Sequence, residues 1–213
     1  IEISSFNHDV DPRIRRTKKA FEANLYARDF TMNAMAYNDS EGLVDIFGGL
    51  EDIEKKVIRC VGRAEERFTE DALRIMRAVR FSAQLGYRIE ENTRKAIIEL
   101  AYTLDRISVE RIQVELTKLL VSKHPEYVQQ LYELGLTKVF LPEFDIMMNT
   151  PQNNPHHIYS VGMHTVKVLE QVPDNKIIRL TALLHDVGKP ATRTTDGKGV
   201  DHFKGHPKLG SEM

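Results

Sequence analysis

The sequence has few of the features that mark secreted or membrane proteins. Its 213 residues include a single cysteine, Cys60, which rules out a disulfide within the chain and fits a reducing cytoplasm. No run of about 18 apolar residues is present, so no membrane span is visible. No basic, apolar and small-residue segment opens the chain, so no signal peptide is visible either. We therefore expect a cytoplasmic protein with no membrane partner.

The sequence also lacks an excess of charge of either sign. Its 30 Lys and Arg residues are balanced by 31 Asp and Glu residues, for a formal net charge of -1. This balance gives no overall attraction to nucleic acid, so a nucleic-acid partner would need a local basic surface. The hydrophobic content of 41% and the charged content of 29% are typical of a folded globular protein and exclude a disordered chain.

The chain does not begin with methionine. It opens with IEISSF, whose alternation has the period of a β-strand, and it closes with HPKLGSEM, where a helix begins. We interpret the sequence as a piece of a longer protein.

The periodicity of the sequence changes near residue 60, and no repeat or low-complexity segment is present. Before that point we predict a strand over residues 1–6, a charged mobile loop over 7–24, a short helix beginning in RDFTMNAMAYN, and a hairpin in DSEGLVDIFGG closed by Gly48 and Gly49. After it, helical periodicity predicts helices over 70–87, 91–104, 108–122, 125–135 and 137–144.

A second boundary follows the turn-rich stretch MMNTPQNNP, after which histidine becomes frequent. Six of the chain's 8 histidines lie beyond it: His156, His157, His164, His185, His202 and His206. The expected fold class is therefore α+β, a small α/β part followed by a helical array. The expected domains are residues 1–60, 61–150 and 151–213.

The stretch ERFTEDALRIMRAVRF combines acids and arginines at helical spacing. With Thr69 as N-cap, Glu70 and Asp71 would lie in the first turn, where the helix dipole favours negative charge. Arg74 follows Asp71 on the same face, and the two could form a surface ion pair worth less than about 1 kcal/mol. The alternative is that they recognise a ligand.

A carboxylate beside a guanidinium can distinguish bases by hydrogen-bond polarity. Asp only accepts and Arg only donates, so the pair matches the amino donor and ring-nitrogen acceptor of cytosine and adenine. Uracil and guanine present the reverse order and would leave buried polar groups unpaired. Such a pair would select CTP and ATP.

Four segments, in this order, resemble the bacterial class II tRNA nucleotidyltransferases and poly(A) polymerases, the family of the CCA-adding enzymes: RDFTMNAMAY, GLVDIFGG, VGRAEERFTEDALRIMRAVRFSAQLGY and ISVERIQVELTKLL. The resemblance covers roughly residues 1–145. It implies part of a polymerase-β-like nucleotidyltransferase head, followed by an all-α neck and body. It also implies that Asp71 and Arg74 are the template for CTP and ATP, and that Arg77 and Arg80 contact nucleotide phosphate or ribose.

The same resemblance assigns the ribose and triphosphate of the nucleotide to Arg28, Asp29 and Asn33 in RDFTMN. The alternative is an ordinary helix start, with Asp29 or Thr31 as the cap. The family usually has a second arginine where this chain has Ala27, which predicts one positive group fewer beside the nucleotide.

Two further acids match family positions. Asp45 in VDIFGG corresponds to a motif thought to act as a spring between domains, although Asp before a Gly pair is also a common turn. Glu2 matches the third carboxylate of the catalytic Mg²⁺ site; its alternative is an exposed strand acid. The family's Asp-x-Asp pair and glycine-rich loop precede this position and are not in the sequence, so we expect the chain as given not to add nucleotides.

The histidine-rich part resembles the HD phosphohydrolase superfamily over roughly residues 156–210. GMHTVKVLE and IRLTALLHDVGKP place His164 and the pair His185 and Asp186 on two helices, the second ended by Gly188 and Pro190. Ile178, Ala182 and His185 share one helical face, which predicts that His185 points to the interior. For any single histidine, a neutral core residue is the alternative.

The HD resemblance implies a divalent metal, either a transition metal or Mg²⁺, bound by His164, His185 and Asp186. His206 would serve a second metal, and His202 is a weaker candidate. The superfamily's last Asp ligand would lie beyond Met213. Lys189 could neutralise a substrate phosphate or be a solvated lysine.

These patterns leave three functions open. The first is CCA addition to tRNA from CTP and ATP, with a poly(A) polymerase of the same family as its nearest alternative. The second is an HD phosphohydrolase whose front half docks RNA, and the third is a noncatalytic RNA-binding protein. In each, RNA would be held by shape and phosphate along the helical body. The oligomeric state is not predicted.

Overall fold

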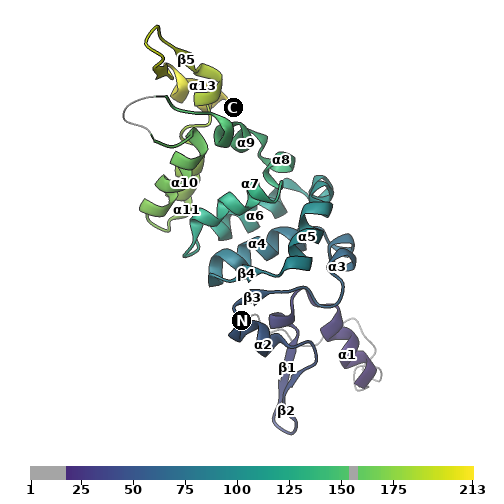
Figure 1. The fold of residues 1–213 in the computed structure, drawn as a ribbon. Coiled ribbons are helices and arrows are strands. Elements are labelled where there is room, and N and C mark those ends of the chain that lie inside the picture. Colours follow the sequence, from purple (N-terminus) through teal and green to yellow (C-terminus); the bar gives the residue numbers. More distant parts are fainter. Residues whose placement is uncertain (1–17, 154–157) are drawn as a thin grey trace.

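The computed structural model describes residues 18–153 and 158–213 (Figure 1). The elements follow one another along an elongated molecule, from the hairpin of β1 (Met35–Asn38) and β2 (Gly42–Asp45) at one end to β5 (Thr194–Thr195) and α13 (His206–Glu212) at the other. The strand predicted over residues 1–6, and Glu2 within it, lie outside the described residues. None of the described helices is long and apolar enough to cross a membrane.

The first part of the chain mixes short helices and strands, as expected for an α+β fold. In addition to β1 and β2, it contains α1 (Lys18–Tyr26), the 3-10 turn η1 (Thr31–Asn33), α2 (Gly49–Glu54) and β3 (Val57–Ile58). The loop predicted over 7–24 is therefore wrong from residue 18 onward. Good helix formers fill KKAFEANLY, and Leu25 anchors α1 in the core.

Two predictions for residues 28–49 are also wrong. The short helix predicted to begin in RDFTMNAMAYN is only the 3-10 turn η1, because Phe30 is fully buried and bridges Cys60, and the chain enters β1 directly after that turn. The hairpin pairs β1 with β2, Asn38 opposite Gly42, rather than closing at the glycine pair. Gly48 instead has a φ of 74° and leads into α2.

Asp45, the last residue of β2, caps the start of α2 with its side chain. Its two carboxylate oxygens accept hydrogen bonds from the backbone N–H groups of Gly49 and Leu50, both at 2.8 Å. These are N–H groups that a helix leaves without an internal partner. The local structure thus explains an acid before Gly48 and Gly49, while the predicted spring remains a prediction.

The helical stretches predicted after residue 60 are all found. They are α3 (Ala64–Glu70), α4 (Leu73–Leu85), α5 (Glu91–Leu100), η2 (Ala101–Arg106), α6 (Val109–Leu120), η3 (Pro125–Tyr127), α7 (Val128–Glu133), α8 (Thr137–Phe140) and α9 (Pro142–Asn149). Gly86, with a φ of 68°, ends α4. The short β4 (Arg88–Ile89) then pairs in parallel with β3.

The helix predicted to start at Thr69 is two helices with a break at Asp71. Thr69 lies inside α3, where its hydroxyl donates to the backbone oxygen of Glu65. Asp71 is extended, with φ -148° and ψ 103°, and its Oδ1 accepts a hydrogen bond from Leu73 N at 3.0 Å. A short acidic side chain that bonds nearby backbone competes with helix continuation, so Asp71 ends α3 and caps α4.

The last part of the chain is a helical unit with one small hairpin. It contains α10 (Val161–Gln171), α11 (Lys176–Leu184) and α12 (Lys189–Thr192), followed by β5, β6 (Asp201–His202) and α13. Ser160 and Asn175 cap α10 and α11 by accepting backbone hydrogen bonds. Gly188 and Pro190 do not end α11, which stops at Leu184; they begin α12.

One hydrophobic core runs through the molecule. It extends from Phe30 in the first part, through α4 and α6, to Leu169 and Val187 in the last part. The prediction that one face of α11 points to the interior is confirmed at Ala182, which is buried, but is wrong at Ile178, which is 41% exposed. The core therefore fixes α4 and α11 relative to each other, and these helices position the candidate sites.

Candidate nucleotide and metal sites

Arg74 is held at the break between α3 and α4. Its Nη1 donates to the backbone oxygen of Arg67 at 3.0 Å and to Glu70 Oε2 at 2.8 Å, and its Nη2 donates to the backbone oxygen of Ala27 at 2.9 Å. A guanidinium has about five N–H donors, so these three contacts fix its orientation and leave others for a ligand. The protein thus holds Arg74 rigidly beside the segment that carries Arg28 and Asp29.

Asp71 has a different partner. While Oδ1 caps α4, Oδ2 accepts a hydrogen bond from Arg111 Nη2 of α6 at 3.2 Å. The ion pair considered between Asp71 and Arg74 is therefore not the pairing observed: Glu70 is the acid that pairs with Arg74. Each oxygen of Asp71 makes one bond, and a carboxylate has about four acceptor positions. Asp71 can still accept from a ligand.

Three of the predicted nucleotide residues, Asp29, Asn33 and Arg77, are in contact, with Asp29 between the other two. Its Oδ1 accepts from Asn33 Nδ2 at 3.1 Å and from Phe30 N at 2.8 Å, and its Oδ2 lies 2.7 Å from Arg77 Nη2. Asp29 is buried, whereas the Arg77 side chain is 26% exposed. The buried acid therefore orients a partly exposed cation. Arg28, the preceding residue, is half-buried.

Arg80 is placed differently from Arg77. It is buried, its Nε lies 2.5 Å from Glu115 Oε2 of α6, and its guanidinium stacks 3.7 Å from the centre of the Phe81 ring. Burial lowers the pKa of Arg80, and the neighbouring Glu115 offsets part of that effect. This arginine links α4 to α6 inside the core.

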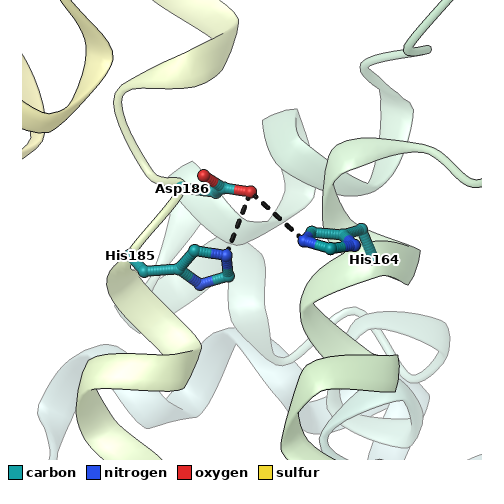
Figure 2. A group of neighbouring side chains, drawn as sticks. All are labelled: His164, His185 and Asp186. Atoms are coloured by element: carbon teal, nitrogen blue, oxygen red, sulfur yellow. Dashed lines mark ion pairs between the residues drawn. The ribbon is translucent and has the colours of Figure 1, made fainter. Parts of the chain in front are cut away.

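The second candidate site lies where α10 meets the end of α11 (Figure 2). His164 comes from α10, and His185 and Asp186 follow α11. Asp186 Oδ2 is 3.1 Å from His185 Nε2 and 3.7 Å from His164 Nε2. One donor atom from each of the three lies within 4.8 Å of the others. The three residues are therefore close enough together to hold one metal ion.

The histidines present their Nε2 atoms to Asp186. His185 Nδ1 contacts the backbone oxygen of Ala182 at 2.8 Å, and His206 Nδ1 contacts that of Phe203 at 2.7 Å. Because a carbonyl only accepts, Nδ1 carries the proton in both residues, and Nε2 is the ring nitrogen that faces Asp186. The His185 side chain is 31% exposed, so the prediction that it points to the interior is only partly met.

His206 joins this group and His202 does not. His206 Nε2 is 3.4 Å from Asp186 Oδ1, the oxygen not shared by the other two histidines. This placement suits the second-metal role predicted for it. His202 Nε2 instead pairs with Asp196 Oδ2 at 2.9 Å across the β5–β6 hairpin.

Lys189 is buried beside the triad, which contradicts the solvated alternative. Its Nζ is 2.8 Å from Asp186 Oδ2 and donates to Gln152 Oε1 at 3.0 Å. No sequence motif points to Gln152, which lies in a turn-rich segment 37 residues before Lys189. Only the fold brings them together.

The electrostatics of the triad favour an ionised carboxylate. Burial would raise the pKa of Asp186, but the bonds from His185 and Lys189 outweigh it and hold this pKa at about 2. The same contact with Asp186 raises the pKa of His185. Asp186 Oδ2 is buried, and its charged or titratable neighbours among the described residues are the Nε2 atoms of His164 and His185 and the ammonium of Lys189. An ionised buried oxygen beside two imidazole nitrogens suits a divalent metal, so these residues fit the ion that the HD motif implies.

The sequence matches three family descriptions in succession. Residues 2–59 match the poly A polymerase head domain, and residues 86–148 match the probable RNA and SrmB-binding site of polymerase A. Residues 156–213 match the HD domain. The chain belongs to the poly(A) polymerase and CCA-adding enzyme family.

Curated members of this family are similar over large parts of the chain. The CCA-adding enzyme of Leuconostoc mesenteroides is 52% identical over 118 residues, which are 55% of this chain and 29% of that protein. The multifunctional CCA protein of Pseudomonas fluorescens is 36% identical over 181 residues, 80% of this chain and 44% of that protein. The chain thus spans less than half the length of these relatives.

Solved structures of the family share the fold. The crystal structure of the Bacillus stearothermophilus CCA-adding enzyme in complex with CTP matches with a TM-score of 0.57 and 42% identity, over 59% of this chain and 33% of that one. The Thermotoga maritima CCA-adding enzyme complexed with tRNA matches with a TM-score of 0.54 and 32% identity, over 62% and 35% of the two chains.

Proposed function

We propose that the protein containing these residues adds CCA to the 3′ ends of tRNA, using CTP and ATP. The observation that carries this proposal is the fixed position of Asp71 and Arg74 on either side of the start of α4, next to the cluster of Asp29, Asn33 and Arg77. The names of the similar proteins support it. Acting on tRNA, such a protein would work in the cytoplasm.

In this proposal the two residues read the base by hydrogen-bond polarity. Asp71 accepts from the exocyclic amino group of cytosine or adenine, and Arg74 donates to the adjacent ring nitrogen. The three anchors on Arg74 keep its position independent of the nucleotide. Discrimination then needs no nucleic-acid template.

The ribose and triphosphate would lie against Arg28, Asn33 and Arg77. Asp29 fixes the orientation of Arg77 and Asn33, so its role is positioning rather than contact with phosphate. We leave Arg80 out of this set, because its guanidinium is buried against Glu115. Mg²⁺ bound by the head, with Glu2 as one ligand, would stabilise the charge on the leaving pyrophosphate.

To test this proposal, tRNA that lacks its 3′ CCA end is given to the protein that contains this chain. With CTP alone we expect addition of two cytidines, and with CTP and ATP the complete end. Incorporation of AMP without CMP would identify a poly(A) polymerase instead. Arg74→Ala should reduce CMP incorporation, while the control Lys95→Ala, an exposed residue of α5, should not. The absence of cytidine addition by the unmodified protein would overturn the proposal.

We also propose that residues 61–150 form the neck and body, after the head of residues 1–60. The body would hold tRNA through phosphates and shape, and counterion release would then make tRNA affinity fall steeply with salt. A filter-binding titration at several salt concentrations measures this slope. A flat response would contradict docking through the lysines and arginines of the helical body.

For residues 151–213 we propose a metal-dependent phosphohydrolase of the HD type. His164, His185 and Asp186 would hold one divalent ion, either a transition metal or Mg²⁺, and His206 would contact a second. The bound ion would supply a hydroxide at neutral pH for attack on a phosphate ester. The chain itself holds Asp186 ionised and directs Nε2 of His185 toward it.

Metal-dependent hydrolysis of a 2′,3′-cyclic phosphate by the protein, lost in His185→Ala, would support this activity. Titration of the chain with Mn²⁺ tests the site separately. Retention of full Mn²⁺ affinity in His185→Ala would contradict the ligand set. If hydrolysis persists while nucleotide addition is absent, the HD domain is the main activity.

A further inference from the structure

Gln152 lies between α9 and α10, and Lys189 connects it to the triad of His164, His185 and Asp186. Its side chain is buried and fixed at both ends: Nε2 donates to the backbone oxygen of Tyr159 at 3.3 Å, and Oε1 accepts from Lys189 Nζ at 3.0 Å. The backbone of the next residue, Asn153, makes two hydrogen bonds to Asp201, both at 2.9 Å. Its N–H donates to the Asp201 carboxylate, and its C=O accepts from the Asp201 N–H. The segment is therefore held firmly, and Oε1 of Gln152 is aimed at Lys189.

Lys189 and a metal ion would share one oxygen. The ammonium lies 2.8 Å from Asp186 Oδ2, the same oxygen that faces the Nε2 atoms of both triad histidines. A cation bound by these histidines and Oδ2 would then be a close neighbour of the ammonium. The Lys189 side chain is only 10% exposed, so water screens the repulsion between the two cations poorly.

We propose that Lys189 and Gln152 together set the divalent-cation affinity of the His164, His185 and Asp186 triad. Lys189 competes with the cation for Oδ2 of Asp186. Gln152 offers the ammonium a second partner and so reduces the cost of releasing Oδ2. Gln152 is thus a positioning residue that acts on the site through Lys189. This inference rests on the metal site proposed above.

A purely structural ion pair is the competing explanation. Buried Lys and Asp pairs occur without any ligand role, and removing one partner then destabilises the fold. That explanation assigns Gln152 no effect on cation binding beyond general loosening. The proposal instead requires effects of opposite sign from Lys189 and Gln152, and it requires that the effect of Gln152 depend on Lys189.

The experiment titrates the chain and its variants with Mn²⁺ by calorimetry, with circular dichroism to verify folding. Lys189→Met removes the competing charge and should raise Mn²⁺ affinity by at least about tenfold. Gln152→Leu removes the alternative partner and should lower the affinity by about threefold or more, while Gln152→Glu, which holds the ammonium more strongly, should raise it. Matched controls are the exposed residues Lys138→Met on α8 and Gln113→Leu on α6, which should leave the affinity unchanged.

The double variant decides between the explanations. In the Lys189→Met background, Gln152→Leu should no longer lower Mn²⁺ affinity, because the ammonium that it positions is absent. An equal loss in both backgrounds would overturn the proposal, as would a Lys189→Met variant with unchanged or weaker affinity. Should Lys189→Met not fold, the opposite signs required of the two Gln152 variants test the same idea. If the unmodified chain binds no Mn²⁺, the metal site itself fails; if it binds but no variant differs, only this inference fails.

Discussion

The charges around α4 and those of the HD domain are arranged in opposite ways. Around α4 each carboxylate faces an arginine: Asp29 with Arg77, Glu70 with Arg74, Asp71 with Arg111 and Glu115 with Arg80. In the HD domain, three imidazoles and one ammonium face a single carboxylate, that of Asp186.

The difference matches what each region is proposed to hold. Balanced pairs fix side chains without a net local charge, which suits the reading of a neutral base by donors and acceptors. Several imidazole nitrogens around one ionised oxygen suit a cation, because imidazoles and carboxylates are common metal ligands. The two regions should therefore respond differently to the loss of one acid.

Glu115→Ala should have the largest effect on stability. Glu115 is buried and pairs with Arg80 and Lys118, so its removal leaves the Arg80 guanidinium buried and uncompensated. We expect a loss of about 3–5 kcal/mol in the free energy of unfolding, measured by urea denaturation. Glu110→Ala, at an exposed position of the same helix, should cost less than about 1 kcal/mol. If Glu115→Ala also costs less than about 1 kcal/mol, the buried pair of Glu115 and Arg80 does not determine stability.

Asp186→Asn should act mainly on the proposed cation site. The side chain keeps its size and one acceptor oxygen, but the ionised ligand is lost, so Mn²⁺ affinity should fall by at least about a hundredfold. Asp29→Asn, which changes a balanced pair near α4 instead, should leave Mn²⁺ affinity unchanged. Equal losses of Mn²⁺ affinity in Asp186→Asn and Asp29→Asn would contradict the proposed difference between the two regions.

These two regions also show how far the sequence alone could go. The motifs identified Asp29, Asn33 and Arg77, but their meeting depends on α4 packing against a segment 48 residues earlier. The helix pattern was predicted correctly after residue 60, because apolar periodicity and glycine stops are local signals. The break at Asp71 was missed, since a capping Asp and an acid in a first turn have the same sequence pattern.

In the HD domain the motif predicted that His164, His185 and Asp186 lie together, but not what surrounds them. Figure 2 shows His164, His185 and Asp186 facing one another, as the motif spacing implied. The burial of Lys189 and its bond to Gln152 could not be predicted, because a lysine near a helix end is usually solvated and glutamine carries no motif.

Asp71 allows capping to be separated from base recognition. Asp71→Ala should lower the free energy of unfolding by about 1 kcal/mol, because α4 loses its N-terminal acceptor. Asp71→Asn should retain the cap and so remain near the stability of the unmodified chain, yet its amide would weaken the preference for CTP over UTP. Nucleotide selectivity is measured by CMP and UMP incorporation in the protein that contains this chain. Unchanged selectivity in Asp71→Asn would remove Asp71 from the template.

The smallest effect is expected at Asp201, a buried acid of the HD domain that is balanced in the manner of the α4 region. The hydrogen bonds from Thr195 and Asn153, with Arg193 beside them, hold the pKa of Asp201 at about 2. An unfolded chain would give this carboxyl a pKa of about 3.9, so it contributes stability above that pH and loses it as the pH falls toward about 2.

Thermal unfolding midpoints between neutral and acidic pH test the sign of this contribution. Asp201→Asn should lower the midpoint at neutral pH and flatten the decline between about pH 4 and pH 2, whereas the exposed Asp174→Asn should change neither. If the unfolding midpoint of Asp201→Asn still falls as steeply between about pH 4 and pH 2 as that of the unmodified chain, other carboxylates cause the fall. Because Asp201 also anchors Asn153, the residue after Gln152, the variant should loosen the contact between Gln152 and Lys189, and a modest change in Mn²⁺ affinity should accompany the lower midpoint.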